Sequence, residues 1–109
     1  MPAKIERVFD QPKIFEMIKA IGNNAVKSQI EFELMKLASL MSVGGNLNDA
    51  QIQFIADQLI DLYPTESISD FKICFQRGAI GSYGNIQRMD GITIREWMDK
   101  YLDEKYIIM

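Results

Sequence analysis

The chain has 109 residues, a length typical of one domain, and 48% hydrophobic with 25% charged residues is ordinary for a globular protein. It contains no histidine and one cysteine, Cys74, which excludes a Ser-His-Asp or Cys-His nucleophile, the common zinc sites that use histidine, and an internal disulfide. The net charge of −3 argues against a protein that coats nucleic acid with its whole surface. We therefore expect a non-enzymatic protein with no catalytic residue, no metal and no cofactor.

The N-terminal segment does not resemble a signal peptide, because Lys4, Glu6, Arg7 and Asp10 interrupt its apolar residues. No apolar run approaches the roughly 20 residues that cross a bilayer. We expect a cytoplasmic protein, in a bacterial cell or a phage-infected host, with no membrane partner.

Residues 1–10 are interpreted as a loose N-terminal arm or a short helical turn. A first helix is predicted from Gln11, with Pro12 at its first position and an apolar stripe at three- and four-residue steps: Ile14, Phe15, Met17, Ile18 and Ile21. Gly22-Asn23-Asn24 then either separates two helices or bends one long helix.

A second helix is predicted over residues 25–41, and the consecutive glycines Gly44-Gly45 that follow are expected to stop it. Its apolar stripe is Val26, Ile30, Leu34, Leu37 and Met41. Met35 and Ala38 are expected to widen this stripe.

A third helix is predicted to begin after Asn48, because a capping residue followed three places later by Gln51 satisfies the free N–H groups of a first turn. Pro64 marks its end. Its buried face is expected to hold Ile52, Ile55, Ala56, Leu59, Ile60 and Tyr63.

A fourth, short helix follows Ser67, which with Asp70 repeats the same capping pattern. Phe71, Cys74 and Phe75 are expected to face inward. Gly78 is expected to end it.

A last helix is predicted from Asp90, with Ile94, Trp97, Met98, Tyr101 and Lys105 along one face. Trp97 is expected in the core, packed on Phe71 or Phe75. The apolar tail Tyr106, Ile107, Ile108 and Met109 is expected to dock on the core or to contact another chain. Since residues 85–89 are at most extended, the fold predicted for residues 1–109 is all-α: one small domain of four or five helices.

The glycine-rich segment from Gly78 to Gly84 is not a P-loop, because it lacks the Gly-Lys-Ser or Gly-Lys-Thr triplet. It is not a dinucleotide fingerprint either, because its glycines have the wrong spacing. A KH-type clamp on RNA would need a three-stranded sheet, which the sequence does not predict. We interpret these glycines as positions where the backbone turns sharply or another element approaches closely, with Gly84 in a geometry that glycine tolerates best.

Around this segment the basic residues Lys72, Arg77 and Arg88 occur with no acid between Phe71 and Met89. Together with Tyr83, taken as exposed, they are the candidate contacts for nucleic acid or a protein partner, because arginines bind phosphate and tyrosine stacks on bases. The dipole of the preceding helix explains Arg77 equally well.

The segment from Phe71 to Tyr101, with its Gly81-x-Tyr83-Gly84, Asp90-Gly91-x-x-Ile94 and Trp97-x-x-x-Tyr101 elements, resembles one in small helical proteins of Bacteroidetes bacteria and their phages or mobile elements. The function of those proteins is unassigned. The likeness covers residues 46–105 and includes Tyr63-Pro64, but Glu104-Lys105 stands where the family often has arginine. The layout is also similar to small helical modules of phage helicase loaders and replisome organisers.

With the absent histidine and the unmatched glycine motifs, this resemblance leads us to expect a non-enzymatic accessory protein of phage or mobile-element type that binds a protein partner, with DNA replication as one setting. Two alternatives remain open. One is a small nucleic-acid-binding domain that uses the basic glycine-rich loop, and the other is a virion or assembly component that self-associates.

Overall fold

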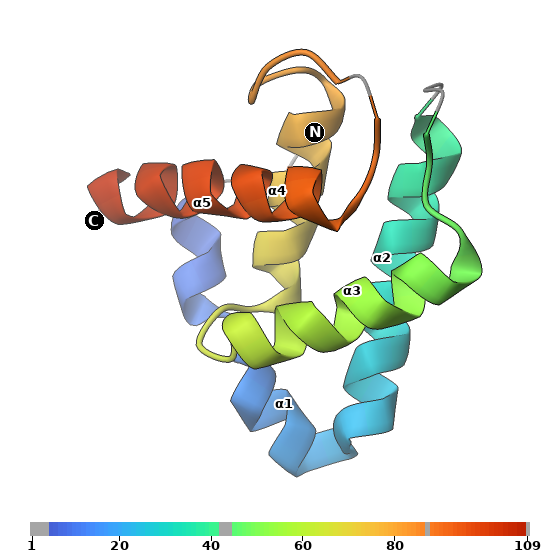
Figure 1. Ribbon diagram of the computed structural model, residues 1–109. Coiled ribbons are helices and arrows are strands. Elements are labelled where there is room, and N and C mark those ends of the chain that lie inside the picture. Colours follow the sequence, from blue (N-terminus) through green and yellow to red (C-terminus); the bar gives the residue numbers. More distant parts are fainter. Residues whose placement is uncertain (1–4, 42–44, 87, 109) are drawn as a thin grey trace.

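The computed structural model describes residues 5–41, 45–86 and 88–108, and these form an all-α domain (Figure 1). Parts of the predicted arm, of the Gly44-Gly45 turn and of the apolar tail fall outside these ranges. In chain order the elements are a 3-10 helix η1 (Ile5–Asp10) and the helices α1 (Ile14–Ile21), α2 (Asn23–Leu40), α3 (Asp49–Leu62), α4 (Ile68–Ala79) and α5 (Gly91–Ile108). The described residues among 85–89 belong to no helix, and an isolated bridge joins Gly45 to Arg88.

Local capping determines where three of these helices begin, as the sequence predicted. The Asn48 side chain accepts from the Gln51 N–H, and the Gln51 side chain accepts from the Asn48 N–H, both at 2.9 Å. Ser67 and Asp70 form the same reciprocal pair before α4. Asp90 accepts from the Thr93 N–H at the start of α5.

The start of the first helix was predicted two residues too early. Helix α1 begins at Ile14, so Pro12 precedes it rather than occupying its first position. The Lys13 N–H instead donates to Glu16 at 2.9 Å. Of the two alternatives for the next segment, the structure shows two separate helices joined at Gly22.

Of the two interpretations of the N-terminal residues, the structure shows the helical turn. Residues 5–10 form η1, which packs against α4 and α5. Val8 is buried in this contact. Apolar burial therefore holds the described part of the segment on the core, where a loose arm would have left it in solvent.

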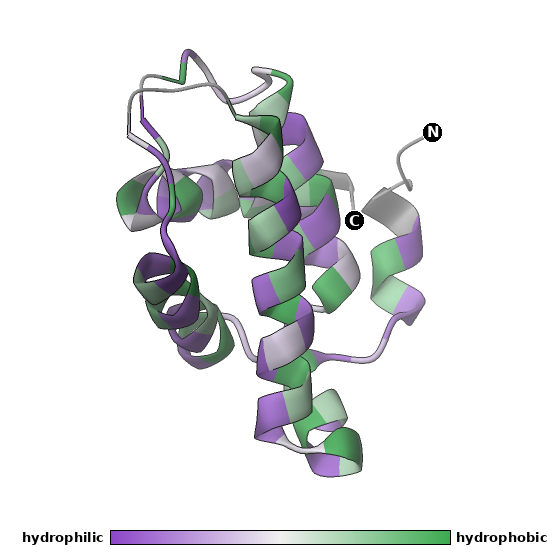
Figure 2. Ribbon diagram, turned by 90° about the vertical axis from the view of Figure 1, so that its right-hand side faces the viewer, coloured by the Kyte–Doolittle hydropathy of each residue, from purple (hydrophilic) through white to green (hydrophobic). Residues whose placement is uncertain are grey.

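Helix α2 is the centre of the fold, and α1, α3 and α4 all pack against it. In Figure 1, α2 and α4 stand roughly upright; α5 crosses in front of α4, and α3 crosses in front of α2 at a lower level. Four residues of the predicted stripe are buried: Val26, Ile30, Leu34 and Leu37. The fifth, Met41, follows the last residue of α2 and is half-buried. Met35, however, is exposed, which corrects the expectation that it widens the stripe. Figure 2 shows hydrophobic and hydrophilic residues alternating along α2.

The aromatic core joins α4 to α5. Phe71, Phe75, Trp97 and Tyr101 are buried, as expected. The Phe71 and Phe75 rings stack on each other, whereas the Trp97 ring lies directly against Gly78. Gly78 therefore does not end α4, which continues to Ala79; it provides the space that the indole fills.

Among the described residues, the helices are too short or too polar to cross a membrane.

Candidate functional site

The basic residues singled out from the sequence are paired with acids from other segments. Arg77 on α4 forms a salt bridge with Glu104 on α5. Arg88 pairs with Asp90 at 2.9 Å, and Lys72 lies 4.0 Å from Glu33 on α2. The fold thus brings Glu104 to Arg77, Glu33 lies at the limit of a salt bridge from Lys72 and also binds Lys36 at 3.1 Å, and the partner of Arg88 is local in sequence.

Tyr83 is buried, not exposed as the sequence suggested. Only 9% of the residue is accessible, and its hydroxyl is buried without a hydrogen-bond partner among the described residues. Burial raises the pKa of this phenol, and the neighbouring Glu104 adds to the rise. A ring in this position cannot stack on a nucleic-acid base unless the loop rearranges.

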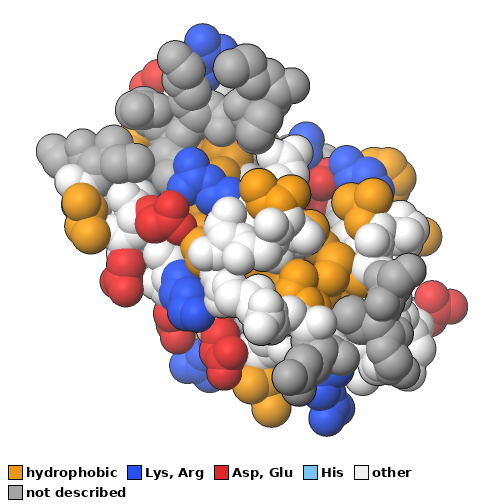
Figure 3. Space-filling model, turned by 90° about the horizontal axis from the view of Figure 1, so that it is seen from above, with side chains coloured by type: hydrophobic (Ala, Val, Ile, Leu, Met, Phe, Trp, Pro, Cys, Tyr) orange, Lys and Arg blue, Asp and Glu red, His pale blue; other side chains and the backbone are white. Residues whose placement is uncertain are grey.

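One contact from α5 holds the glycine-rich loop, and a second holds the helix that precedes it. Lys100 on α5 donates to the Tyr83 carbonyl oxygen at 2.9 Å, and Glu104 binds Arg77. Figure 3 looks onto the end of the molecule that carries this loop, and the basic and acidic side chains of the described residues are interspersed there. Contact of Lys72, Arg77 and Arg88 with nucleic acid or a protein partner stays a prediction, while the expected exposure of Tyr83 is wrong.

The predicted apolar tail is the last turn of α5 as far as it is described, since the helix runs to Ile108. Its two described side chains differ in their surroundings. The Tyr106 hydroxyl donates to Glu66 at 2.9 Å, while Ile107 is 82% exposed.

A buried polar cluster lies between α5 and the α3–α4 turn. Lys105, 1% exposed, forms salt bridges with Glu66 and, at 3.3 Å, with Asp70. The Tyr101 hydroxyl donates to the other oxygen of Asp70, and the Phe9 ring lies 4.9 Å from the Lys105 nitrogen. Lys105 thus occupies the predicted buried face because two carboxylates compensate its charge.

Hydrogen bonding in this cluster stabilises particular protonation states. Burial alone lowers the pKa of Lys105, but the hydrogen bond that its ammonium donates to Glu66 and the charges of Asp70 and Glu66 outweigh this effect, so the pKa is raised. Burial and Asp70 raise the pKa of Tyr101.

Because Asp70 also caps α4 through Ser67, these contacts connect the start of α4 to the end of α5. We interpret the cluster as a structural connection, since every named group already has a protein partner.

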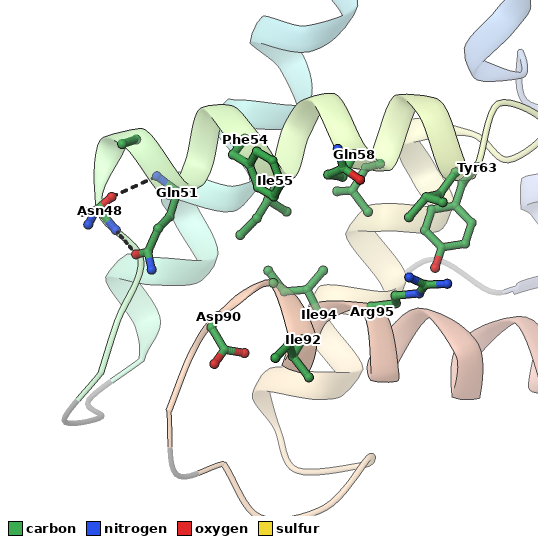
Figure 4. Close-up of a pocket in the computed structure, with 14 residues that line it drawn as sticks. Asn48, Gln51, Phe54, Ile55, Gln58, Tyr63, Asp90, Ile92, Ile94 and Arg95 are labelled. Atoms are coloured by element: carbon green, nitrogen blue, oxygen red, sulfur yellow. Dashed lines mark hydrogen bonds between the residues drawn. The ribbon is translucent and has the colours of Figure 1, made fainter.

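A groove of about 620 Å³ lies between α3 and the first turns of α5. Its floor is buried and apolar, with Ile55 and Leu59 on α3 and Ile94 on α5. In Figure 4, Ile55 and Ile94 point toward each other across it. Its walls carry exposed apolar side chains, with Phe54 64% and Ile92 71% accessible.

Few polar groups line the groove. Gln51 and Gln58 lie along α3, with Gln51 engaged in the helix cap, and Asp90 is engaged by Thr93 and Arg88. At the other end Arg95 lies beside the Tyr63 hydroxyl (Figure 4). Burial raises the pKa of Tyr63, Asp99 raises it further, and Arg95 lowers it, so both charges act on this end of the groove.

Sequence reasoning did not identify this groove, although a signal for it exists. Phe54 lies beside the predicted core stripe of the third helix rather than in it, and Ile92 lies on the polar side of the last helix. Large apolar residues outside a core stripe indicate a second contact surface.

The described residues contain no group of three or more histidine, cysteine or acidic side chains that could hold a metal ion. Cys74 is buried in the core, and burial raises the pKa of its thiol well above the ordinary value. A protonated, inaccessible thiol is a poor nucleophile.

Comparisons of the chain with protein-family models, with curated proteins and with solved structures give no match.

Proposed function

We propose that this chain is a non-enzymatic protein-binding domain whose groove between α3 and α5 receives a protein partner. The observation that carries the proposal is the exposure of Phe54 and Ile92 on the two walls of an apolar groove. Leu62, also exposed, extends the same surface along α3. Contiguous apolar surface rimmed by polar residues is typical of protein interaction sites.

The resemblance to small proteins of Bacteroidetes phages and mobile elements supports an accessory role in such an element, in the cytoplasm of the bacterium or the infected host. Because the layout is also similar to helicase loaders and replisome organisers, DNA replication is the process to test first. That likeness concerns the fold, so the groove carries the argument for binding.

Site-specific photo-crosslinking in the native host tests this function. A photoreactive phenylalanine analogue at position 54 is expected to trap a discrete protein, and the same analogue at position 80 serves as the control. Ile80 is 80% exposed, so a probe there is as accessible as one at position 54, but Ile80 does not line the groove.

A product specific to position 54 that contains another protein supports the proposal. Equal products at both positions, or none at position 54, would contradict it. A product containing only a second copy of this chain would instead favour the assembly alternative. The variant Phe54→Ser is expected to prevent the complex while changing the free energy of unfolding by less than about 0.5 kcal/mol, because the side chain is exposed.

A further inference from the structure

The flanks of the groove are acidic. On α3, Asp61 follows Phe54 by seven residues and Gln58 by three, so it lies on the outer side of the lining stripe. On α5, Asp99 follows Ile92 by seven residues and Arg95 by four. Asp99 also acts on the pKa of the groove residue Tyr63, which places its charge near the same end.

These flanking carboxylates are available to a partner. Asp61 and Asp99 are exposed, and neither forms a salt bridge within the described residues. Glu96, one turn after Ile92, is likewise exposed and without a salt bridge there. Arg95 is the basic residue among the groove's lining residues, against the three carboxylates of Asp61, Glu96 and Asp99. Asp90 and Arg88 are not counted on either side, because they pair with each other.

We propose that the occupant of the groove is a basic amphipathic helix of another protein, with its apolar stripe on the groove and lysine or arginine residues facing Asp61 and Asp99. This inference rests on the proposed function and specifies the partner's chemistry. An amphipathic helix in an apolar groove is a recurring mode of recognition, read as apolar anchors three and four residues apart. Complementary charge on the flanks adds specificity and speeds association.

The shape of the groove favours a helix over a small apolar ligand. Phe54 and Ile92 stand out of the walls instead of closing over the floor, so a ligand held on the floor would leave most of their surface in water. Helix α3 has 14 residues, about 21 Å of length, along which its lining residues extend from Ala50 to Leu62. A partner helix lying alongside covers both walls.

The charge argues against a second copy of this chain as the occupant. Two copies related by a twofold axis would bring their acidic flanks together, and each chain carries a net charge of −3. Repulsion between like charges across an interface disfavours that pairing.

The probe is a pair of synthetic peptides of about 18 residues, long enough to cover α3. Both carry the same leucine stripe at helical spacing and a lactam bridge that stabilises the helix, and they differ only in flanking lysines or flanking glutamates. Binding to the full chain is measured by fluorescence anisotropy at low and high salt. We expect the lysine peptide to bind more tightly, with an affinity that falls as salt rises.

The double variant Asp61→Asn/Asp99→Asn is expected to weaken the lysine peptide about three- to tenfold at low salt and to flatten its salt dependence. The matched control Asp10→Asn/Glu31→Gln removes two charges outside the groove that form no salt bridge in the described residues, and it should leave the affinity unchanged. Phe54→Ser should weaken both peptides.

Equal binding of the lysine peptide to the Asp61/Asp99 variant and to the wild type would overturn the inference, as would tighter binding of the glutamate peptide. A concentration-dependent dimer in analytical ultracentrifugation that Phe54→Ser dissociates would overturn it in favour of a second copy. If neither peptide binds but position 54 still crosslinks to a protein, the inference fails and the proposed function stands. If position 54 crosslinks to nothing, the proposed function itself fails.

Discussion

The indole of Trp97 on α5 lies directly against Gly78 on α4, so closely that a Cβ added to Gly78 would meet indole carbons such as Trp97 Cε3. Both residues are buried. The contact sets the distance between α4 and α5, and with it the position of α5, whose first turns form one wall of the groove.

Gly78→Ala is expected to destabilise the protein by about 1–3 kcal/mol, because the indole or the backbone must move to admit a methyl group. Urea denaturation followed by circular dichroism measures the change. The control is Gly91→Ala at the start of α5, where the added Cβ would lie at an ordinary 3.5 Å from Ile55. Equal stability of Gly78→Ala and wild type would contradict the close packing.

Trp97→Ala should cost about 3–5 kcal/mol, because it leaves a cavity in the core. Combined with Gly78→Ala it should cost less than the sum of the two single changes, since the added methyl group then occupies part of that cavity. A double-mutant cycle measures this coupling, and strict additivity would show that the two residues do not interact.

Gly84 has a φ of +111°, as expected from its place in the glycine-rich segment. No atom lies within 4 Å of a Cβ built there, so strain and not crowding opposes substitution. Gly84→Ala is expected to lower the free energy of unfolding by about 1–3 kcal/mol in chemical denaturation. Ser82→Ala, on an exposed neighbour, should have little effect, and equal effects of the two variants would argue against backbone strain.

The buried cluster predicts a loss of stability at alkaline pH. The pKa of Lys105 is raised above 10.5 and that of Tyr101 above 10.0. Folding thus favours the protonated form of both groups, and the stability they contribute is complete below about pH 10 and decreases as pH rises above these unfolded-state values. Urea midpoints measured between pH 8 and pH 11 should fall at the upper end, and less steeply in Tyr101→Phe.

Neutralising Lys105 leaves two carboxylates buried without a cation. Lys105→Met is therefore expected to destabilise the protein by about 3–5 kcal/mol at neutral pH. Lys100→Met serves as the comparison, since Lys100 is exposed and binds one backbone carbonyl. A similar small loss in both variants would show that the buried ion pairs contribute little.

The paired state of the basic residues predicts weak binding to nucleic acid. Arg77 and Arg88 are held by Glu104 and Asp90, and Tyr83 is buried. Labelled single- and double-stranded oligonucleotides at low salt are expected to show no binding tighter than about 100 μM. Tighter binding that weakens with salt and is lost in Arg77→Gln/Arg88→Gln would restore the nucleic-acid alternative.

Much of the fold could be predicted because its signals are local. The capping pairs Asn48–Gln51 and Ser67–Asp70 join residues three apart, so the sequence alone places the starts of α3 and α4. The apolar stripe of α2 identifies its buried side in the same way. The expectation for Met35 is wrong because the apolar pattern of a helix does not show how wide a strip of its surface the neighbouring helices cover.

The sequence could not show which acids lie near Arg77 and Lys72, because those acids are distant in the chain or on another helix. Glu104 is 27 residues from Arg77, and Glu33 lies on a different helix from Lys72. An acid-free stretch in the sequence therefore says little about local charge in the folded chain.

The sequence by itself determined the helical class, the starts of α3, α4 and α5 and the central apolar stripe of α2, since these depend on contacts within one or two turns. The tertiary structure alone decided that Lys105 is buried against Glu66, 39 residues away, and that Trp97 fills the space left by Gly78. It also decided that α3 and α5 leave Phe54 and Ile92 exposed on the walls of one groove. Such pairings follow from the angles at which helices cross, which depend on the packing of the whole core and not on any single segment.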